Sequence, residues 1–270
     1  MMKLIKEIYI IWLREMIRYW RVKTRLVSSL AMPVLWLVLF GSGMKSTLSM
    51  GGAGAEFDFL QFLFPGVIGM SILFTSIFSV MSIVLDRQFG FLKEVLVAPV
   101  SRSSIALGKI LGGSTTAMIQ GTVMLFLAPL VGIKLSFGLV FALIPVMFLA
   151  AIALTSIGLV VASRMKTTEG FQMIMNFLMM PMFFLSGALF PLNDLPVWME
   201  ILAKMNPASY AVDLIRQVAF KFMDAPAFLV DNLSLELFGE KVSILMDLGI
   251  VAVFGAVMVS IGVLLFRKSD

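Results

Sequence analysis

The chain contains no cysteine and no histidine in 270 residues, and charged side chains make up only 14% of it. The first absence excludes a disulfide scaffold and thiolate chemistry, and the second removes the commonest general base and metal ligand. Hydrophobic residues reach 60%, which is more than a soluble core can bury. We therefore expect a polytopic membrane protein without a catalytic site, a metal site or a cofactor of its own.

Six apolar runs approach or exceed the length of about 20 residues that a membrane-spanning helix needs. They cover residues 26–43, 59–85, 105–131, 139–162, 171–190 and 244–266. The second and third runs exceed that length, which predicts tilt or extension into water. The sequence thus predicts an all-α polytopic membrane protein with six transmembrane helices.

Lysine and arginine orient these spans, because short cytoplasmic connections are enriched in them. Basic residues precede the first run and follow the second, fourth and sixth, whereas the short connections on the other side hold only Lys45 and Lys134. We therefore expect a multi-pass protein of the cell membrane, with both termini in the cytoplasm and residues 191–243 outside. The net charge of +5 follows this topology and is not gathered into a patch, so no nucleic-acid partner is expected.

Residues 1–25 are the first expected unit, a cytoplasmic amphipathic helix at the membrane interface. At about 100° per residue, the charged residues share one face and the apolar residues share the opposite one. The charged set is Lys3, Lys6, Glu7, Arg14, Arg18 and Arg21, and the apolar set is Leu4, Ile5, Ile8, Tyr9, Trp12, Met16, Tyr19 and Trp20. Two roles stay open, a surface anchor in membrane lipid and a contact with a cytoplasmic partner.

The segment 86–104 is charged and contains proline between two apolar runs, so it must lie outside the lipid. Phe89, Leu92 and Val95 recur at helical spacing, which predicts a short amphipathic helix. A solvated loop that only reverses the chain is the alternative. Ser101 and Ser104 can cap the helix that follows.

This segment resembles the cytoplasmic coupling region of ABC-2 type export permeases, the membrane subunits of type V ABC exporters such as the daunorubicin-resistance and nodulation-factor permeases. The matching residues are Asp86, Arg87, Gln88 and Gly90, then Leu96, Ala98, Pro99, Val100, Ser101 and Arg102, and finally Gly108 with Lys109. Two residues depart from the family pattern: Gln88 stands where a glutamate is usual, and Phe91 where a threonine is usual.

A second block after the fifth run resembles the same family. Its matching residues are Ser186, Gly187, Phe190, Pro191, Leu195, Pro196, Trp198, Asn206, Pro207, Tyr210, Asp213 and Arg216. The resemblance covers nearly the whole chain and implies a six-span domain over residues 26–270, with an extracellular re-entrant hairpin at 191–243. Tyr210, Asp213 and Arg216 share one helical face. The simplest explanation is an exposed helix stabilised by an Asp213–Arg216 pair, and a role in substrate release is the alternative.

The resemblance implies the permease subunit of an ATP-driven exporter. Because the sequence has no G-x-x-x-x-G-K-[ST] loop, ATP and Mg are expected in a separate ATPase subunit that docks on the coupling segment 86–104. The residues expected at this contact are Asp86, Arg87, Gln88, Phe89, Gly90, Phe91, Leu92, Lys93, Glu94, Pro99 and Arg102. A second permease copy is also expected, as a homodimer, because six spans make a thin wall for a translocation pathway.

The expected cargo is an amphipathic or hydrophobic compound that is drug-, lipid- or glycan-like. The fifth run is rich in Met and Phe, which adapt to varied apolar ligands, although lipid contact or packing explains this composition too. The candidate pathway residues are Gln120, Met175, Asn176, Met179, Met180 and Phe183.

The alternative function is an ATP-independent channel or an ion-coupled secondary transporter. An ion-coupled carrier usually has an ionisable residue at the bilayer midplane, and the sequence places none there, since Asp247 lies near the outer end of its run. An intramembrane enzyme is a third class, which the missing histidine, cysteine and midplane acid pair argue against.

Overall fold

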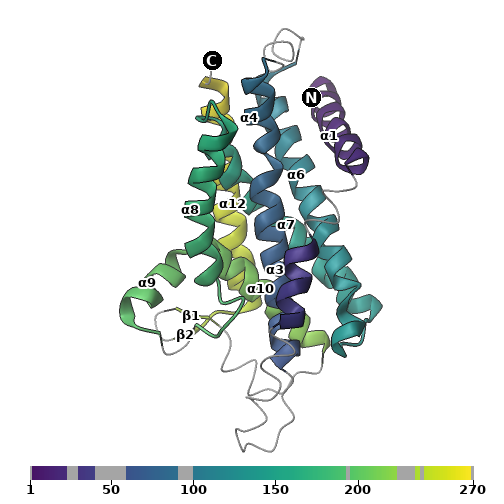
Figure 1. Ribbon diagram of the computed structural model, residues 1–270, viewed down its shortest axis with the longest axis vertical. Coiled ribbons are helices and arrows are strands. Elements are labelled where there is room, and N and C mark those ends of the chain that lie inside the picture. Colours follow the sequence, from purple (N-terminus) through teal and green to yellow (C-terminus); the bar gives the residue numbers. More distant parts are fainter. Residues whose placement is uncertain are drawn as a thin grey trace, which may run out of the picture.

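The computed structural model describes residues 2–22, 30–39, 59–90, 100–192, 195–223, 235–237 and 240–268, which form a bundle of long helices (Figure 1). The helices are α1 (Met2–Arg21), a short helix (Leu30–Leu39), α3 (Phe59–Ser79), α4 (Met81–Gln88), α6 (Arg102–Leu125), the 3-10 helix η1 (Ala128–Val131), α7 (Phe137–Ala162), α8 (Thr168–Phe184), α9 (Val197–Met205), α10 (Pro207–Phe222) and α12 (Ile244–Lys268). Two short strands, β1 (Glu236–Leu237) and β2 (Glu240–Lys241), pair antiparallel before α12. The helical fold class is therefore confirmed.

Four helical stretches within the described residues are long and apolar enough to cross a membrane, namely Phe62–Gln88, Arg102–Leu130, Phe137–Ala162 and Ile244–Lys268. They match the second, third, fourth and sixth predicted runs. Of the first run, 26–43, the structure describes only the helix Leu30–Leu39. The count of six spans therefore stays a prediction.

The fifth run was predicted to span residues 171–190, and its predicted end is wrong. It forms α8, which begins at Thr168 and stops at Phe184. Gly187 then adopts φ 73°, a left-handed conformation that glycine takes without a steric penalty and that reverses the chain. The turn places the following residues against the bundle, where the carbonyl of Ala188 approaches Gly66 of α3.

Helix α3 lies at the centre of the bundle and contacts α6, α7 and α10. Its side chains Leu63, Ile72 and Ile77 are fully buried. After a break at Val80 the same direction continues in α4, so the two helices form one long span. By contrast α12 lies at the periphery against α7, with many apolar side chains exposed, as expected for a surface that faces lipid.

Three serine or threonine side chains mark where long helices begin. Ser101, Ser136 and Thr167 are the N-cap residues of α6, α7 and α8, and each accepts a hydrogen bond from a backbone N–H three residues further on. The prediction that Ser101 caps the third span is confirmed.

The expectation of an exposed helix around Asp213 is wrong. Helix α10 packs against α3, α7 and α12, and both Asp213 and Arg216 are 3% exposed. Its start is specified locally, because Pro207 occupies the first helical position and Asn206 accepts a hydrogen bond from the N–H of Ala208. Helix α9 is more peripheral, with Trp198 62% exposed.

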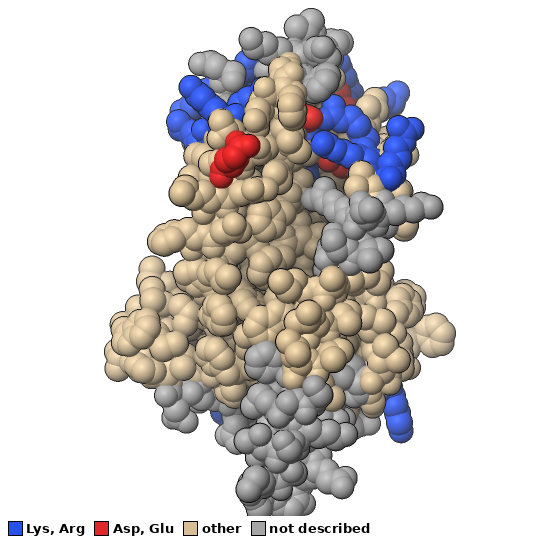
Figure 2. Space-filling model, in the orientation of Figure 1, with Lys and Arg blue, Asp and Glu red and all other residues tan. Residues whose placement is uncertain are grey.

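The two ends of the bundle differ in charge. The end formed by α1, the end of α4, the start of α6, the α7–α8 turn and the end of α12 carries most of the visible lysine and arginine, and we name it the basic end (Figures 1 and 2). The opposite end, with η1, α9, α10 and the two strands, is the distal end. Between them Figure 2 shows a broad band without charged side chains on the visible face. This pattern fits a bundle that spans a membrane with one end in each aqueous phase.

Candidate functional site

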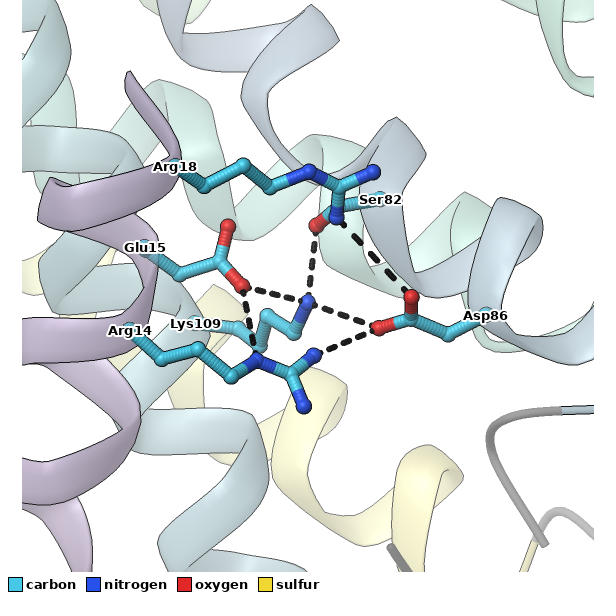
Figure 3. A network of polar contacts seen from close by, with 6 residues as sticks. All are labelled: Arg14, Glu15, Arg18, Ser82, Asp86 and Lys109. Carbon is cyan, nitrogen blue, oxygen red and sulfur yellow. Dashed lines mark hydrogen bonds and ion pairs between the residues drawn. The ribbon is translucent and has the colours of Figure 1, made fainter. Parts of the chain in front are cut away.

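Lys109 is the buried cation of the basic end. It lies two turns into α6 and is only 4% exposed. Its Nζ lies 2.7 Å from Glu15 Oε1 of α1, 2.8 Å from Ser82 Oγ of α4 and 3.1 Å from Asp86 Oδ2 at the end of α4 (Figure 3). The ammonium group donates hydrogen bonds to Ser82 and Asp86 and forms an ion pair with Glu15. One side chain therefore connects three helices.

Two arginines of α1 surround the same acids. Arg14 Nη2 lies 2.8 Å from Asp86 Oδ2, and Arg18 Nη1 lies 3.8 Å from Asp86 Oδ1. Arg14 Nε also lies 3.9 Å from Glu15 Oε1. We name this set the Lys109 network, and it consists of Arg14, Glu15, Arg18, Ser82, Asp86 and Lys109 (Figure 3). Because the arginines are partly exposed, the buried Lys109 contacts dominate its energetics.

The other side of the α4 end binds the turn between α7 and α8. Arg87 Nη1 donates to the carbonyl oxygens of Ala162 and Met165, at 3.3 and 2.5 Å. Gln88 Oε1 accepts hydrogen bonds from the backbone N–H and the hydroxyl of Thr168, at 3.1 and 2.9 Å. Gln88 was noted as a departure from the family glutamate, and its amide oxygen here supplies an acceptor for the start of α8.

The far flank of the coupling segment is bound as well. Glu7 Oε2 of α1 accepts from the backbone N–H of Ser101 at 3.1 Å and from the Ser104 hydroxyl at 2.7 Å. The Ser104 hydroxyl, followed by the Ser101 N–H, lowers the pKa of the Glu7 carboxyl. Arg102 Nη1 donates to the carbonyl oxygen of Arg267 at the end of α12, at 2.9 Å.

The residues at the middle of the predicted contact, Phe91, Leu92, Lys93, Glu94 and Pro99, lie outside the described residues. Their neighbours are informative. Phe89 is 67% exposed, and Gly90 takes φ 79° with open space around it. The chain thus leaves α4 through a glycine turn, beside an exposed aromatic side chain.

The predicted amphipathic helix exists, but it does not lie free on a surface. Met16 and Tyr19 of α1 are buried, and Trp12 Nε1 donates to Thr115 Oγ1 of α6 at 3.0 Å. Leu4, Ile5, Tyr9 and Trp20 are exposed. Helix α1 therefore has one edge packed on α6 and a second, apolar edge available to lipid.

The predicted pathway residues do not share one surface. Met180 and Phe183 of α8 border an apolar cavity of about 380 Å³, together with Trp36 of the short helix and Phe74 of α3. Met175 and Met179 are buried in the core, and Gln120 is fully buried in α6. Asn176 is exposed one turn before Met180 on α8 and does not border this cavity.

The residues of the second motif connect α10 to the end of α8. Asn206 Nδ2 donates to Met182 O and Ser209 Oγ to Leu185 O, both at 2.8 Å. Arg216 donates to the carbonyl of Gly187 and lies over the ring of Phe62, 4.5 Å from its centroid. In the same region the Ser186 hydroxyl donates to Phe183 O and the Tyr210 hydroxyl to Lys204 O. The chain between α8 and α9 contains Pro191 and Pro196, and Trp198 lies in the first turn of α9. These contacts fix the distal end.

Sequence reasoning missed Glu15 as a partner of Lys109, and it gave Gln217 and Asp247 no shared role. A lysine inside an apolar helix requires an acidic partner, and this signal could have indicated a buried pair. Within the described residues, no three histidine, cysteine, aspartate or glutamate side chains lie close enough to hold a metal ion.

Comparison with known proteins supports the family assignment. Residues 6–220 match the sequence model of the ABC-2 type transporter family. The putative transport permease ycf38 of Cyanophora paradoxa is 30% identical over 266 residues, covering 98% of this chain and 89% of the relative. Nodulation protein J of Rhizobium leguminosarum bv. viciae is 28% identical, over 71% of this chain and 73% of its own length. The inner membrane transport permease YadH of Escherichia coli K12 is 27% identical, over 80% and 84%.

Proposed function

This chain belongs to the ABC-2 type transporter family, and on that premise we propose that it is the permease subunit of an ATP-driven exporter in the cell membrane. It is a multi-pass membrane permease, and the chemistry of ATP hydrolysis is assigned to a separate ATPase subunit that binds ATP and Mg. Two copies of the permease, forming a homodimer, enclose the pathway. The cargo is an amphipathic or hydrophobic compound.

The ATPase docks at the basic end, on the coupling segment 86–104. The observation that carries this proposal is that both flanks of the segment are bound to the rest of the bundle. Asp86 and Gln88 connect one flank to α1, α6 and the α7–α8 turn, and Ser101 and Arg102 connect the other to α1 and α12. A displacement of the segment by a docked subunit would therefore move several helices together.

The apolar cavity between the short helix, α3 and α8 is the proposed contact surface for cargo. Its border is mainly aromatic and methionine side chains, with the Ser71 and Thr75 hydroxyls as small polar groups. Such a surface suits an apolar compound that carries a few hydrogen-bonding groups. The exposed side of α8, which includes Phe177 and the polar Asn176, is available for lipid or for the second copy.

Topology is the first test, and the absence of cysteine makes it direct. Phe89→Cys at the basic end and Trp198→Cys at the distal end both replace exposed side chains. In sealed right-side-out vesicles, a membrane-impermeant maleimide should label Trp198→Cys, and in inverted vesicles it should label Phe89→Cys. Labelling of Phe89→Cys from the external side would place the docking segment away from any cytoplasmic ATPase.

The second test concerns energy coupling. Purification of the tagged chain from its own membrane should retain an ATPase, and transport in vesicles should stop with vanadate. Glu94→Lys should reduce both retention and transport, whereas Glu200→Lys at the distal end is the matched charge reversal that should change neither. Transport without a retained ATPase, and insensitive to vanadate, would favour the alternative of a channel or an ion-coupled carrier.

A further inference from the structure

Two buried carboxyl groups meet at the distal end, away from the coupling segment. Asp213 belongs to α10, and Asp247 lies in the first turn of α12. Asp213 is 3% exposed and Asp247 is fully buried. Gln217, one turn after Asp213, lies between them. No described contact of this group involves the residues proposed to bind the ATPase.

The hydrogen bonds of this group do not balance with both acids ionised. Gln217 Nε2 lies 2.8 Å from Asp213 Oδ2, 2.8 Å from Asp247 Oδ2 and 3.0 Å from the carbonyl oxygen of Val242. An amide nitrogen carries only two hydrogens, so Gln217 can donate to two of these three acceptors, while Asp213 Oδ2 also accepts from the N–H of Leu235. Asp247 Oδ1 is also buried and has no hydrogen-bond partner among the described residues. Within the described part of the chain, Asp247 Oδ1 therefore lacks a donor.

The charges do not balance either. Arg216 is the cation that acts on Asp213, and its guanidinium is directed to the Gly187 carbonyl and the Phe62 ring. Two ionised carboxylates with one guanidinium leave a net negative charge in a buried position, which is unfavourable by several kcal/mol. Burial raises the pKa of the Asp213 carboxyl, in agreement with this count.

The described parts of the other elements packed against α10 carry no further buried cation. The described parts of α3 and α7 carry no charged residue. On α9, Lys204 pairs with Glu200 at 2.5 Å. Arg267 and Lys268 of α12 lie at the basic end, and Lys241 of β2 is exposed. Tyr210 also faces the group from α10 and remains neutral at physiological pH, since burial raises the pKa of its hydroxyl.

We propose that Asp213 and Asp247 together bind one proton, and that this proton-binding site joins α10 to the start of α12. The shared proton supplies the missing donor and brings the group, with Arg216, to zero net charge. The two carboxyl groups lie on the same Gln217 amide nitrogen, each with an oxygen 2.8 Å from it, so a proton bound by one is close to the other. Leu235 N also donates to Asp213 Oδ2 at 3.2 Å. The site therefore contacts the chain just before β1, at Leu235, and just after β2, at Val242.

Infrared spectroscopy of the full chain in lipid nanodiscs tests for the proton directly. The wild type at pH 7 should show the carbonyl band of a buried protonated carboxyl group, shifted in D₂O, and this band should disappear at high pH. It should be absent from Asp213→Asn and from Asp247→Asn, because one ionised acid with Arg216 is already neutral. A wild-type spectrum without the band at pH 7 overturns the proposal, even if neither variant folds.

Thermal unfolding gives an independent test. Between the ordinary pKa range of aspartate and the higher pH at which the pair loses its proton, the folded state binds one more proton than the unfolded state. The unfolding equilibrium constant should therefore rise by up to about tenfold per pH unit in this interval. Asp247→Asn should remove this dependence, and Glu200→Gln, an exposed carboxyl of the same end, should leave it unchanged. A melting temperature that depends on Na⁺ but not on pH would identify a metal cation in place of the proton and overturn the proposal.

Discussion

At the residue scale, Lys109 shows how a membrane protein can place a full charge inside its bundle. Three oxygens from α1 and α4 surround the ammonium group, and two of them belong to carboxylates. Paired in this way, the charge costs little, but removing one partner leaves the others buried without compensation. The network therefore makes the positions of α1, α4 and α6 depend on one another.

Replacing Lys109 with methionine should destabilise the protein. The change keeps a side chain of similar length but leaves Glu15 and Asp86 without their buried cation, at a cost of about 3 kcal/mol. The thermal unfolding of the purified chain in nanodiscs measures the effect as a lower melting temperature. Lys268→Met, at the exposed end of α12, is the matched control. Equal melting temperatures for the two variants would show that the Lys109 network contributes nothing to stability.

At the element scale, α1 is more than an interfacial helix, because it binds both flanks of the coupling segment. Arg14 reaches Asp86 on one flank, and Glu7 reaches Ser101 and Ser104 on the other. Its packing on α6 is close: a methyl group at Gly108 would lie 2.7 Å from the side chain of Ile11. A partner that docks on the segment therefore acts on α1 at the same time.

The contact of Glu7 should depend on pH. The Ser104 hydroxyl and the Ser101 N–H lower the pKa of this carboxyl, so the contact is complete above the ordinary range of glutamate and is lost as pH falls through the lowered pKa. Hydrogen exchange of the first turns of α1 should accelerate at acid pH in the wild type. Glu7→Gln should show the faster exchange already at neutral pH. Exchange that does not change with pH in the wild type would contradict this prediction.

Local patterns predicted the elements well, and long-range contacts explain the differences. Apolar runs long enough to span a membrane identified four helices, and Ser101 marked the start of α6 because an N-cap acts within one turn. The end of α8 was not predictable, because it depends on Gly187 meeting Arg216 from α10. The charged residues of α10 also suggested an exposed helix. Their buried partners lie far away in the sequence, so helical periodicity alone did not reveal them.

The same reasoning explains the site. The placement of residues 86–104 outside the lipid was predicted from charge and proline between two apolar runs, without any knowledge of contacts. The partner of Lys109 did not, because Glu15 lies on a helix whose charged residues all appear to face water when it is considered alone. Helical periodicity describes one helix at a time, and a buried ion pair is a property of two.

At the scale of the whole molecule, polar networks lie at the two ends and an apolar bundle connects them. The Lys109 network fixes the basic end and the Asp213–Asp247 group fixes the distal end, while α3 and α7 pass through the core without a charged residue. Long helices transmit displacement along their axes, since their backbone hydrogen bonds are satisfied internally. Motion that begins at the coupling segment can therefore reach the distal end through the helices themselves.

Arg102 connects this motion to α12, because its guanidinium donates to the carbonyl oxygen of Arg267 at the end of that helix. Arg102→Ala removes a contact worth about 1 kcal/mol, so the cargo transported per ATP hydrolysed should fall by about fivefold. Retention of the ATPase should persist, because the rest of the docking segment is intact. Arg164→Ala removes an exposed arginine of the same end and is the matched control. An Arg102→Ala variant that loses ATPase binding and transport together would show that Arg102 serves docking and that α12 receives its motion by another route.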